Sequence, residues 1–301
     1  MPATPRSQRD ELTGARGAVF LLTDYGLEDE LAGVLRASVI RIAPRAPVVD
    51  LGHGLPPFDV RAGALALARS VPHLGKGIVV AVVDPGVATD RRPVAIEVAP
   101  RRRPRVGGGD SGTGAGPELD AEGPRYLVGP DNGLLCWALE ALGGALAAVE
   151  LTVARRERST FDGRDVFAPA AARLWLGEPL EQLGSRIDPS DIVKLDPLRC
   201  DVTLGRIDTE ITWIDRFGNV QLVACPMDMD LAGLSELSTL QLEVGGRVFG
   251  ARSYDSFAEV PQGEVGLVVD ANGRLAVAAD RRSAARLLEV TVGERVVIRS
   301  V

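Results

Sequence analysis

Histidine, cysteine and long apolar runs are scarce in this 301-residue sequence, and each scarcity excludes a class of protein. With only two histidines, His53 and His73, a zinc site built on histidine and cysteine is not expected. The three cysteines, Cys136, Cys200 and Cys225, form no CxxC pair, which predicts reduced, mostly buried thiols in a cytoplasmic protein. No run approaches the ~18 apolar residues of a membrane span, and no signal peptide is recognisable, so no membrane partner is expected.

The common nucleotide-binding and nucleophile motifs are also missing. No GxGxxG follows an expected strand, Gly75-Lys76 lacks the rest of a P-loop, and no GxSxG occurs. The formal net charge is −7, whereas a nucleic-acid partner usually requires a basic face. The sequence therefore favours neither a dinucleotide cofactor nor a serine nucleophile nor a nucleic-acid partner.

What the chain does contain, up to about residue 197, is an alternation of short buried strands with helical stretches. We expect strands at 18–22, 48–51, 78–83, 94–98 and 125–128, and helices at 28–42, 60–71 and 134–142. This alternation predicts an α/β domain over 17–197, doubly wound and Rossmann-like with a mostly parallel sheet, after a flexible tail at 1–16.

Residues 100–124 interrupt this pattern with arginines, glycines, prolines and acidic residues. Such a composition does not bury enough apolar area to offset its ordering entropy, which predicts a solvated surface insertion. Its three consecutive arginines also resemble a nucleic-acid patch, but the aromatic partners of such a patch are missing.

The pattern of expected secondary structure changes again near residue 202. Short strands are expected at 210–214, 240–244, 265–269, 275–278 and 290–298, with one helix near 282–288. Gly245-Gly246 and Asn272-Gly273 separate two pairs of these strands, and an asparagine-glycine pair is a strong hairpin signal. We therefore predict a smaller, antiparallel, barrel-like β domain over 202–301.

The most informative stretch is the valine-rich run 79–83, which leads directly into Asp84. Pro85 and Gly86 end this strand, and Arg91 follows within a few residues. Ligands of open parallel sheets bind at the carboxyl ends of the strands, so Asp84 stands where a site is expected. The alternative is a plain turn in which Asp84 caps a backbone N–H.

Several ordered motifs resemble the S-adenosylmethionine hydroxide adenosyltransferases, relatives of the fluorinase and chlorinase. The resemblance spans about 18–290 and rests on Thr23-Asp-Tyr-Gly, Pro56-Pro-Phe-Asp-Val60, Val83-Asp-Pro-Gly-Val87 with Arg91-Arg92, Gly129-Pro-Asp-Asn-Gly-Leu134, Thr160-Phe-Asp-Gly-Arg-Asp165, Phe167-Ala-Pro-Ala170 and Ile214-Asp-Arg-Phe-Gly-Asn219. It implies hydrolysis of S-adenosylmethionine to adenosine and methionine without metal or cofactor. It also implies a homotrimer whose sites lie between subunits.

The resemblance also implies roles for individual residues. Asp84 and Arg91 match two members of the family's Asp-Arg-His set around the attacking water, and the halogenases have tyrosine at the Asp84 position. The implied substrate contacts are Asp24 for the ribose hydroxyls, Phe58 for the nucleoside, Asp29 and Asp215 for the methionine ammonium, and Phe217 and Asn219 for adenine, with Phe161 as a further substrate-binding residue.

This chain departs from the family pattern at two positions. The family's histidine falls at Asp162, and Ala271 stands where a serine is common. Three functions are therefore carried forward: the hydrolase, with Asp162 substituting for the histidine; a protein that binds S-adenosylmethionine or adenosine with weak or no turnover; and a halide-dependent adenosyl transferase. In the second, Asp162 turns away to Arg164 or caps a turn.

Overall fold

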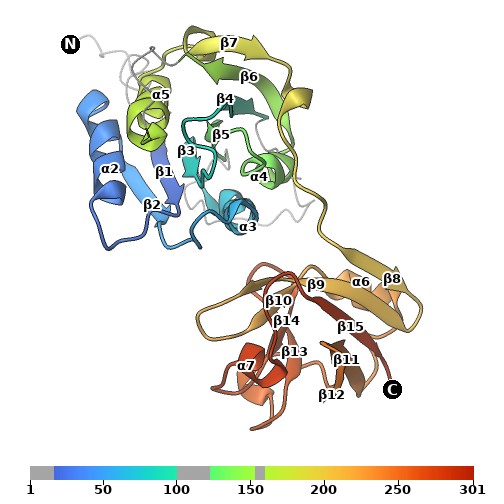
Figure 1. Ribbon diagram of the computed structural model, residues 1–301. Helices are drawn as coiled ribbons and strands as arrows, with labels where there is room; N and C mark the ends of the chain where they lie inside the picture. The colour runs from blue at the N-terminus through green and yellow to red at the C-terminus, as the bar shows by residue number, and fades with distance from the viewer. Residues whose placement is uncertain (1–16, 100–122, 153–159) are drawn as a thin grey trace, which may run out of the picture. The chain divides into compact units, whose positions relative to one another are not determined.

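The computed structural model describes residues 17–99, 123–152 and 160–301, and its contacts divide the chain into two compact units between Leu195 and Asp196 (Figure 1). The expected tail 1–16 and most of the expected insertion 100–124 lie outside the described residues. Across the described ranges, no helix has both the length and the apolar character needed to cross a membrane.

A seven-stranded sheet runs through the described part of the first unit, in the order β2-β1-β3-β5-β4-β6-β7. Its strands are β1 (Ala18–Thr23), β2 (Val48–Gly52), β3 (Gly77–Val82), β4 (Pro93–Val98), β5 (Tyr126–Pro130), β6 (Ala145–Leu151) and β7 (Gly184–Ile187). β2, β1, β3 and β5 are parallel, but β4 is antiparallel to both its neighbours and β7 is antiparallel to β6. The α/β class is confirmed, whereas the expected mostly parallel sheet is a mixed one.

The short link between β3 and β4 explains this difference. A parallel pair needs a long crossover, usually a helix, but residues 83–92 contain no helix. The chain therefore enters β4 at the same sheet edge where it leaves β3, and β4 runs the opposite way. This reversal returns Arg91 to the edge at which Asp84 stands.

Helices cover both faces of the sheet. They are α2 (Leu31–Ile42), α3 (Val60–Ser70), α4 (Cys136–Ala141) and α5 (Ala168–Trp175), the last continuing from a π-helical turn, η2 (Gly163–Phe167). Val19 and Leu21 of β1 pack with α2 and α5 in one core cluster. α3 lies close to the end of β3, since a Cβ on Gly63 would come within 2.9 Å of Val83 Cγ2.

The second unit contains an antiparallel sheet in the order β12-β11-β15-β9-β10-β14-β13, with β8 also paired to β9. Its elements are β8 (Cys200–Thr203), β9 (Arg206–Ile214), β10 (Val220–Leu222), α6 (Pro226–Leu231), β11 (Leu240–Val244), β12 (Arg247–Ala251), β13 (Gly266–Val269), β14 (Leu275–Ala278), α7 (Ala284–Leu288) and β15 (Arg295–Ser300). The hairpin at Asn272-Gly273 is confirmed. Gly245-Gly246 forms a turn as expected, but it leads into β12, a strand not expected from the sequence.

Three local expectations need correction. The strand expected from 290 begins only at Arg295, because Gly293 has a φ of +89° and the Glu294 carboxylate accepts the Thr291 N–H in a turn. The first helix begins at Leu31 rather than near 28. Of the three free cysteines only Cys136 is buried, whereas Cys200 and Cys225 are half-buried.

Candidate active site

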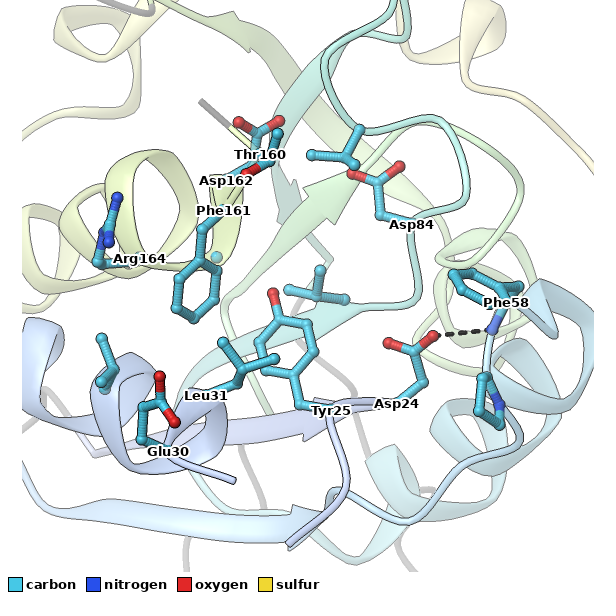
Figure 2. Close-up of a pocket in the computed structure, with 15 residues that line it drawn as sticks. Asp24, Tyr25, Glu30, Leu31, Phe58, Asp84, Thr160, Phe161, Asp162 and Arg164 are labelled. Atoms are coloured by element: carbon cyan, nitrogen blue, oxygen red, sulfur yellow. Dashed lines mark hydrogen bonds between the residues drawn. The ribbon is translucent and has the colours of Figure 1, made fainter. Parts of the chain in front are cut away.

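A cavity of about 610 Å³ lies at the carboxyl ends of β1 and β3 in the first unit (Figure 2). Five segments line it: the turn after β1, the end of β3 with the loop that follows it, the turn before α3, the start of α2, and residues 160–164, which lead into η2 and begin it. Its lining comprises Asp24, Tyr25, Glu30, Leu31, Val34, Pro57, Phe58, Val82, Asp84, Val87, Thr160, Phe161, Asp162, Gly163 and Arg164. The topology thus brings five predicted binding or catalytic positions of the first unit to one cavity: Asp24, Phe58, Asp84, Phe161 and Asp162.

Arg91 joins the two carboxylates Asp84 and Asp162. Its Nε donates to Asp84 Oδ1 at 3.1 Å, and its Nη2 donates both to Asp84 Oδ2 and, at 2.7 Å, to Asp162 Oδ2. The Arg91 and Asp84 side chains are only 8% and 6% exposed, and that of Asp162 is 17% exposed. A guanidinium shared by two nearly buried carboxylates offsets the repulsion between them.

Burial dominates the electrostatics of this cluster. Desolvation raises the pKa of the Asp84 carboxyl, the Arg91 guanidinium lowers it, and the Asp162 carboxylate raises it again. Desolvation and the nearby carboxylates Asp24 and Asp84 also raise the pKa of the Tyr25 hydroxyl, which therefore stays protonated. A carboxylate with a raised pKa is a stronger base than one exposed to water, as proton abstraction requires.

Asp24 points into the cavity from the turn after β1 and lies beside Phe58 (Figure 2). Its Oδ2 accepts the Phe58 N–H at 2.9 Å. Phe58 has a φ of +65° and is 70% exposed, an unusual conformation for a bulky residue. The hydrogen bond to Asp24 therefore stabilises Phe58 in a left-handed backbone conformation that phenylalanine rarely adopts, and the Phe58 ring stays exposed.

The wall opposite Phe58 is built from Tyr25 and Phe161, whose rings meet edge to face at 5.4 Å between centroids. Gly163 permits this packing, because a Cβ there would lie 2.3 Å from the Tyr25 hydroxyl oxygen. Arg164 donates to the Asp165 carboxylate rather than to Asp162. The alternative in which Asp162 turns toward Arg164 is therefore not the arrangement observed.

The remaining predicted binding residues lie elsewhere. Asp29 accepts the Leu31 N–H at the start of α2, and its neighbour Glu30 lines the cavity. Asp215 belongs to the second unit, between β9 and β10, where its carboxylate accepts the backbone N–H groups of Phe217 and Asn219 and the Asn219 amide. Their roles in binding stay predictions.

Sequence reasoning missed several lining residues, notably Tyr25, Glu30, Thr160 and Arg164. Three of these stood inside motifs already singled out, so their neighbours gave a usable signal. For Glu30 the only signal in the sequence was its position beside Asp29 at the start of a helix. Of the two histidines, His53 is buried with Nδ1 2.8 Å from the Thr23 hydroxyl, and His73 is exposed.

Comparison with known proteins gives consistent matches along both units. The model of the SAM hydroxide adenosyltransferase N-terminal domain matches residues 19–113 and 119–184, and that of the C-terminal domain matches 209–297. An (R)-S-adenosyl-L-methionine hydrolase of Salinispora arenicola is 40% identical over 278 residues, covering 91% of this chain and 94% of that protein. A fluorinase of an Actinoplanes species is 28% identical over 269 residues, covering 86% and 90%.

The fold is also similar to solved structures. The crystal structure of an uncharacterized conserved protein from Thermotoga maritima matches with a TM-score of 0.78 at 29% sequence identity. The match covers 94% of this chain and 100% of that one. The similarity therefore extends over both units.

Proposed function

The chain belongs to the SAM hydroxide adenosyltransferase family, and from this premise we propose that its first-unit cavity hydrolyses (R)-S-adenosyl-L-methionine to adenosine and L-methionine. The observation that carries the proposal is the pair of carboxylates, Asp84 and Asp162, held by Arg91 at the cavity. The chain is an enzyme, and its greater identity to the hydrolases than to the fluorinases favours water over halide as the nucleophile.

The reaction suits a site built from a buried carboxylate. The water oxygen forms a bond to C5′ of the ribose while the C5′–S bond breaks and its electron pair goes to sulfur. The leaving group is a neutral thioether, so no general acid is required. Asp84 takes the proton that the attacking water loses, a contribution of about 10²–10⁴-fold for general base catalysis.

Arg91 and Asp162 complete this base. The two donors of Arg91 fix the Asp84 carboxylate in one orientation, and the cation keeps it ionised despite its burial. Asp162 takes the place of the family's histidine as an acceptor that orients the water. Asp24 receives the ribose hydroxyls, and Phe58 and Phe161 pack on the nucleoside. No metal or cofactor has a role in this scheme.

In this proposal the second unit of a neighbouring subunit supplies the remaining substrate contacts. Asp215, Phe217 and Asn219 form one compact turn there, and Phe217 is 73% exposed and available to a ligand. We assign this turn to substrate held in the first-unit cavity of a neighbouring subunit of a homotrimer, and Asp29 to the methionine ammonium of substrate in the cavity of its own subunit. The three free cysteines are consistent with a cytoplasmic location.

The direct test is to incubate the protein with S-adenosylmethionine and measure adenosine and methionine by chromatography. We expect both products in equal amounts without halide. Binding of adenosine without turnover would instead identify a binding protein, and a 5′-halo-adenosine formed only with chloride or fluoride would identify a halide-dependent transferase. Either result overturns the hydrolase assignment.

Asp162 allows a sharper prediction, because the amide of Asp162→Asn retains an oxygen for Arg91 but loses the charge. We expect this variant to lower kcat by about tenfold or more if the carboxylate orients water, and Asp162→His to retain or raise kcat. The control is Glu178→Gln, which alters an arginine-paired carboxylate beyond the end of α5. If Asp162→Asn matches the wild type, Asp84 and Arg91 suffice.

The oligomer makes a further prediction. Because the turn at 215–219 belongs to the second unit, an active site that uses a neighbour's turn requires an oligomer. Light scattering coupled to size-exclusion chromatography is expected to give the mass of a trimer, with adenosine release confined to that fraction. A fully active monomer would contradict the shared site.

A further inference from the structure

The turn that follows β5, residues 131–135, has no role in the reaction proposed above, yet its side chains reach the loop that carries Asp84 and Arg91. Asn132 Nδ2 donates to the Val83 carbonyl at 2.9 Å, immediately before Asp84. Asn132 Oδ1 accepts the Leu134 N–H at 3.1 Å, which fixes the orientation of the amide. The outgoing end of loop 84–92 is therefore tied to this turn.

Asp131 ties down the returning end of the same loop. Its Oδ2 accepts from Arg92 Nε and Nη2 at 2.9 and 2.5 Å, and its backbone N–H donates to the Arg92 carbonyl at 2.9 Å. Its Oδ1 accepts the Val193 N–H at 2.8 Å, and the carboxylate is 1% exposed. A buried carboxylate with every oxygen occupied by N–H donors is a rigid anchor.

We propose that Asp131 and Asn132 are positioning residues that fix both ends of loop 84–92 and thereby hold Arg91 against Asp84. The two consecutive arginines then have separate tasks: Arg92 fastens the backbone to Asp131, and Arg91, one residue earlier, reaches the cavity carboxylates. This inference rests on the proposed function, because it assigns the turn to the same catalytic pair.

The charges around Asp84 allow the positioning role of Asp131 and Asn132 to be tested without measuring catalytic activity. The ionisable groups that face this carboxyl are Arg91, Asp162 and Tyr25. Displacing Arg91 removes the cation that lowers the pKa of Asp84, so the pKa rises further. Removing the Asp131 charge would by itself change the pKa of Asp84 in the opposite direction, because the loss of a nearby negative charge lowers the pKa of a carboxyl group. Asn132→Ala changes no charge.

The experiment is a ¹³C NMR titration of the Asp84 carboxyl carbon in the ligand-free protein, assigned from its absence in Asp84→Asn. We expect the pKa of Asp84 to rise by about 0.5 or more in Asp131→Asn, Arg92→Ala and Asn132→Ala, with Arg92→Lys between wild type and Arg92→Ala. The matched control is Glu97→Gln, an arginine-paired carboxylate on β4 held by Arg125, which should leave the titration unchanged.

Kinetics supply the second readout. Adenosine release by these variants is expected to show kcat lowered by about tenfold to hundredfold, with a smaller change in KM, because misplacing a catalytic group by about 1 Å has effects of this size. An unchanged Asp84 pKa in Asn132→Ala and Arg92→Ala, or a pKa that falls in Asp131→Asn and rises in Arg92→Ala, overturns the proposal. If wild type releases no adenosine, the proposed function fails, but the titration still decides the positioning role.

Discussion

Replacing Asp84 with asparagine is expected to lower kcat for adenosine release by about 10²–10⁴-fold, the usual range for loss of a general base. The amide is similar in size and retains an oxygen for Arg91, so the loop should keep its shape. The substrate contacts assigned to Asp24 and Phe58 do not involve Asp84, so KM should change far less. Steady-state kinetics of wild type and Asp84→Asn at saturating S-adenosylmethionine measure this effect.

The pH dependence of the wild type provides an independent check. In the proposed mechanism Asp84 acts in its ionised form, and burial raises its pKa in the folded protein. Activity is therefore present above this raised pKa and falls as the pH drops through it. The acid limb of kcat should lie above the pH at which an exposed carboxyl titrates.

A matched control comes from the same loop. Asp90 is exposed beside Arg91, and Asp90→Asn removes one charge there without touching the cavity. This variant should retain wild-type kcat and the same acid limb. A wild-type kcat in Asp84→Asn would remove Asp84 from the chemistry and leave the proton acceptor unassigned.

Replacing Asp24 with alanine is expected to weaken adenosine binding by about 2–4 kcal/mol, or about 30- to 700-fold in Kd. Hydrogen bonds to a charged group contribute about 1.5–3 kcal/mol each, and two such bonds to one ribose do not add fully. The substitution also frees the Phe58 N–H, so the ring loses its anchor. Isothermal titration calorimetry with adenosine measures the loss.

Two further variants separate these contributions. Asp24→Asn keeps an acceptor for the Phe58 N–H but loses the charge, so its effect should lie between those of wild type and alanine. Asp59→Asn removes a neighbouring charge and retains a side chain suited to accept the Ala62 N–H at the start of α3. It should bind adenosine as wild type does. Unchanged affinity in Asp24→Ala would exclude Asp24 from the ribose site.

The strand pattern of the first unit could be predicted from the sequence more readily than strand direction. Short apolar runs marked β3 and β4 because buried strands need apolar side chains on both faces. The same runs contain no information on whether β4 runs with or against its neighbours. The direction of β4 follows from the helix-free link at 83–92. This link is visible in the sequence, but the prediction of a mostly parallel sheet did not take it into account.

Some contacts of the site could be predicted from sequence spacing, and others could not. Arg91 lies seven positions from Asp84, so a short loop after a strand was enough to suggest their contact. Asp162 lies 71 positions from Arg91, and only the family resemblance linked the two. Spacing alone does not predict such a contact, because it depends on how η2 packs over the sheet edge. The anchoring by Asn132 and Asp131 depends on hydrogen bonds to backbone groups and to the Arg92 side chain, which sequence spacing does not specify.

Because Phe58 has a left-handed backbone conformation, the residue that gives the highest thermal stability at this position differs from the one that binds the ligand best. A bulky residue at positive φ costs about 1–3 kcal/mol, which glycine would not incur. The ring is largely exposed in the ligand-free protein, so little burial offsets that cost. Phe58→Gly should therefore melt at a higher temperature than wild type in calorimetry while binding adenosine more weakly. Under the proposed function, selection for heat tolerance alone would remove this aromatic ring, whereas selection for turnover would keep it.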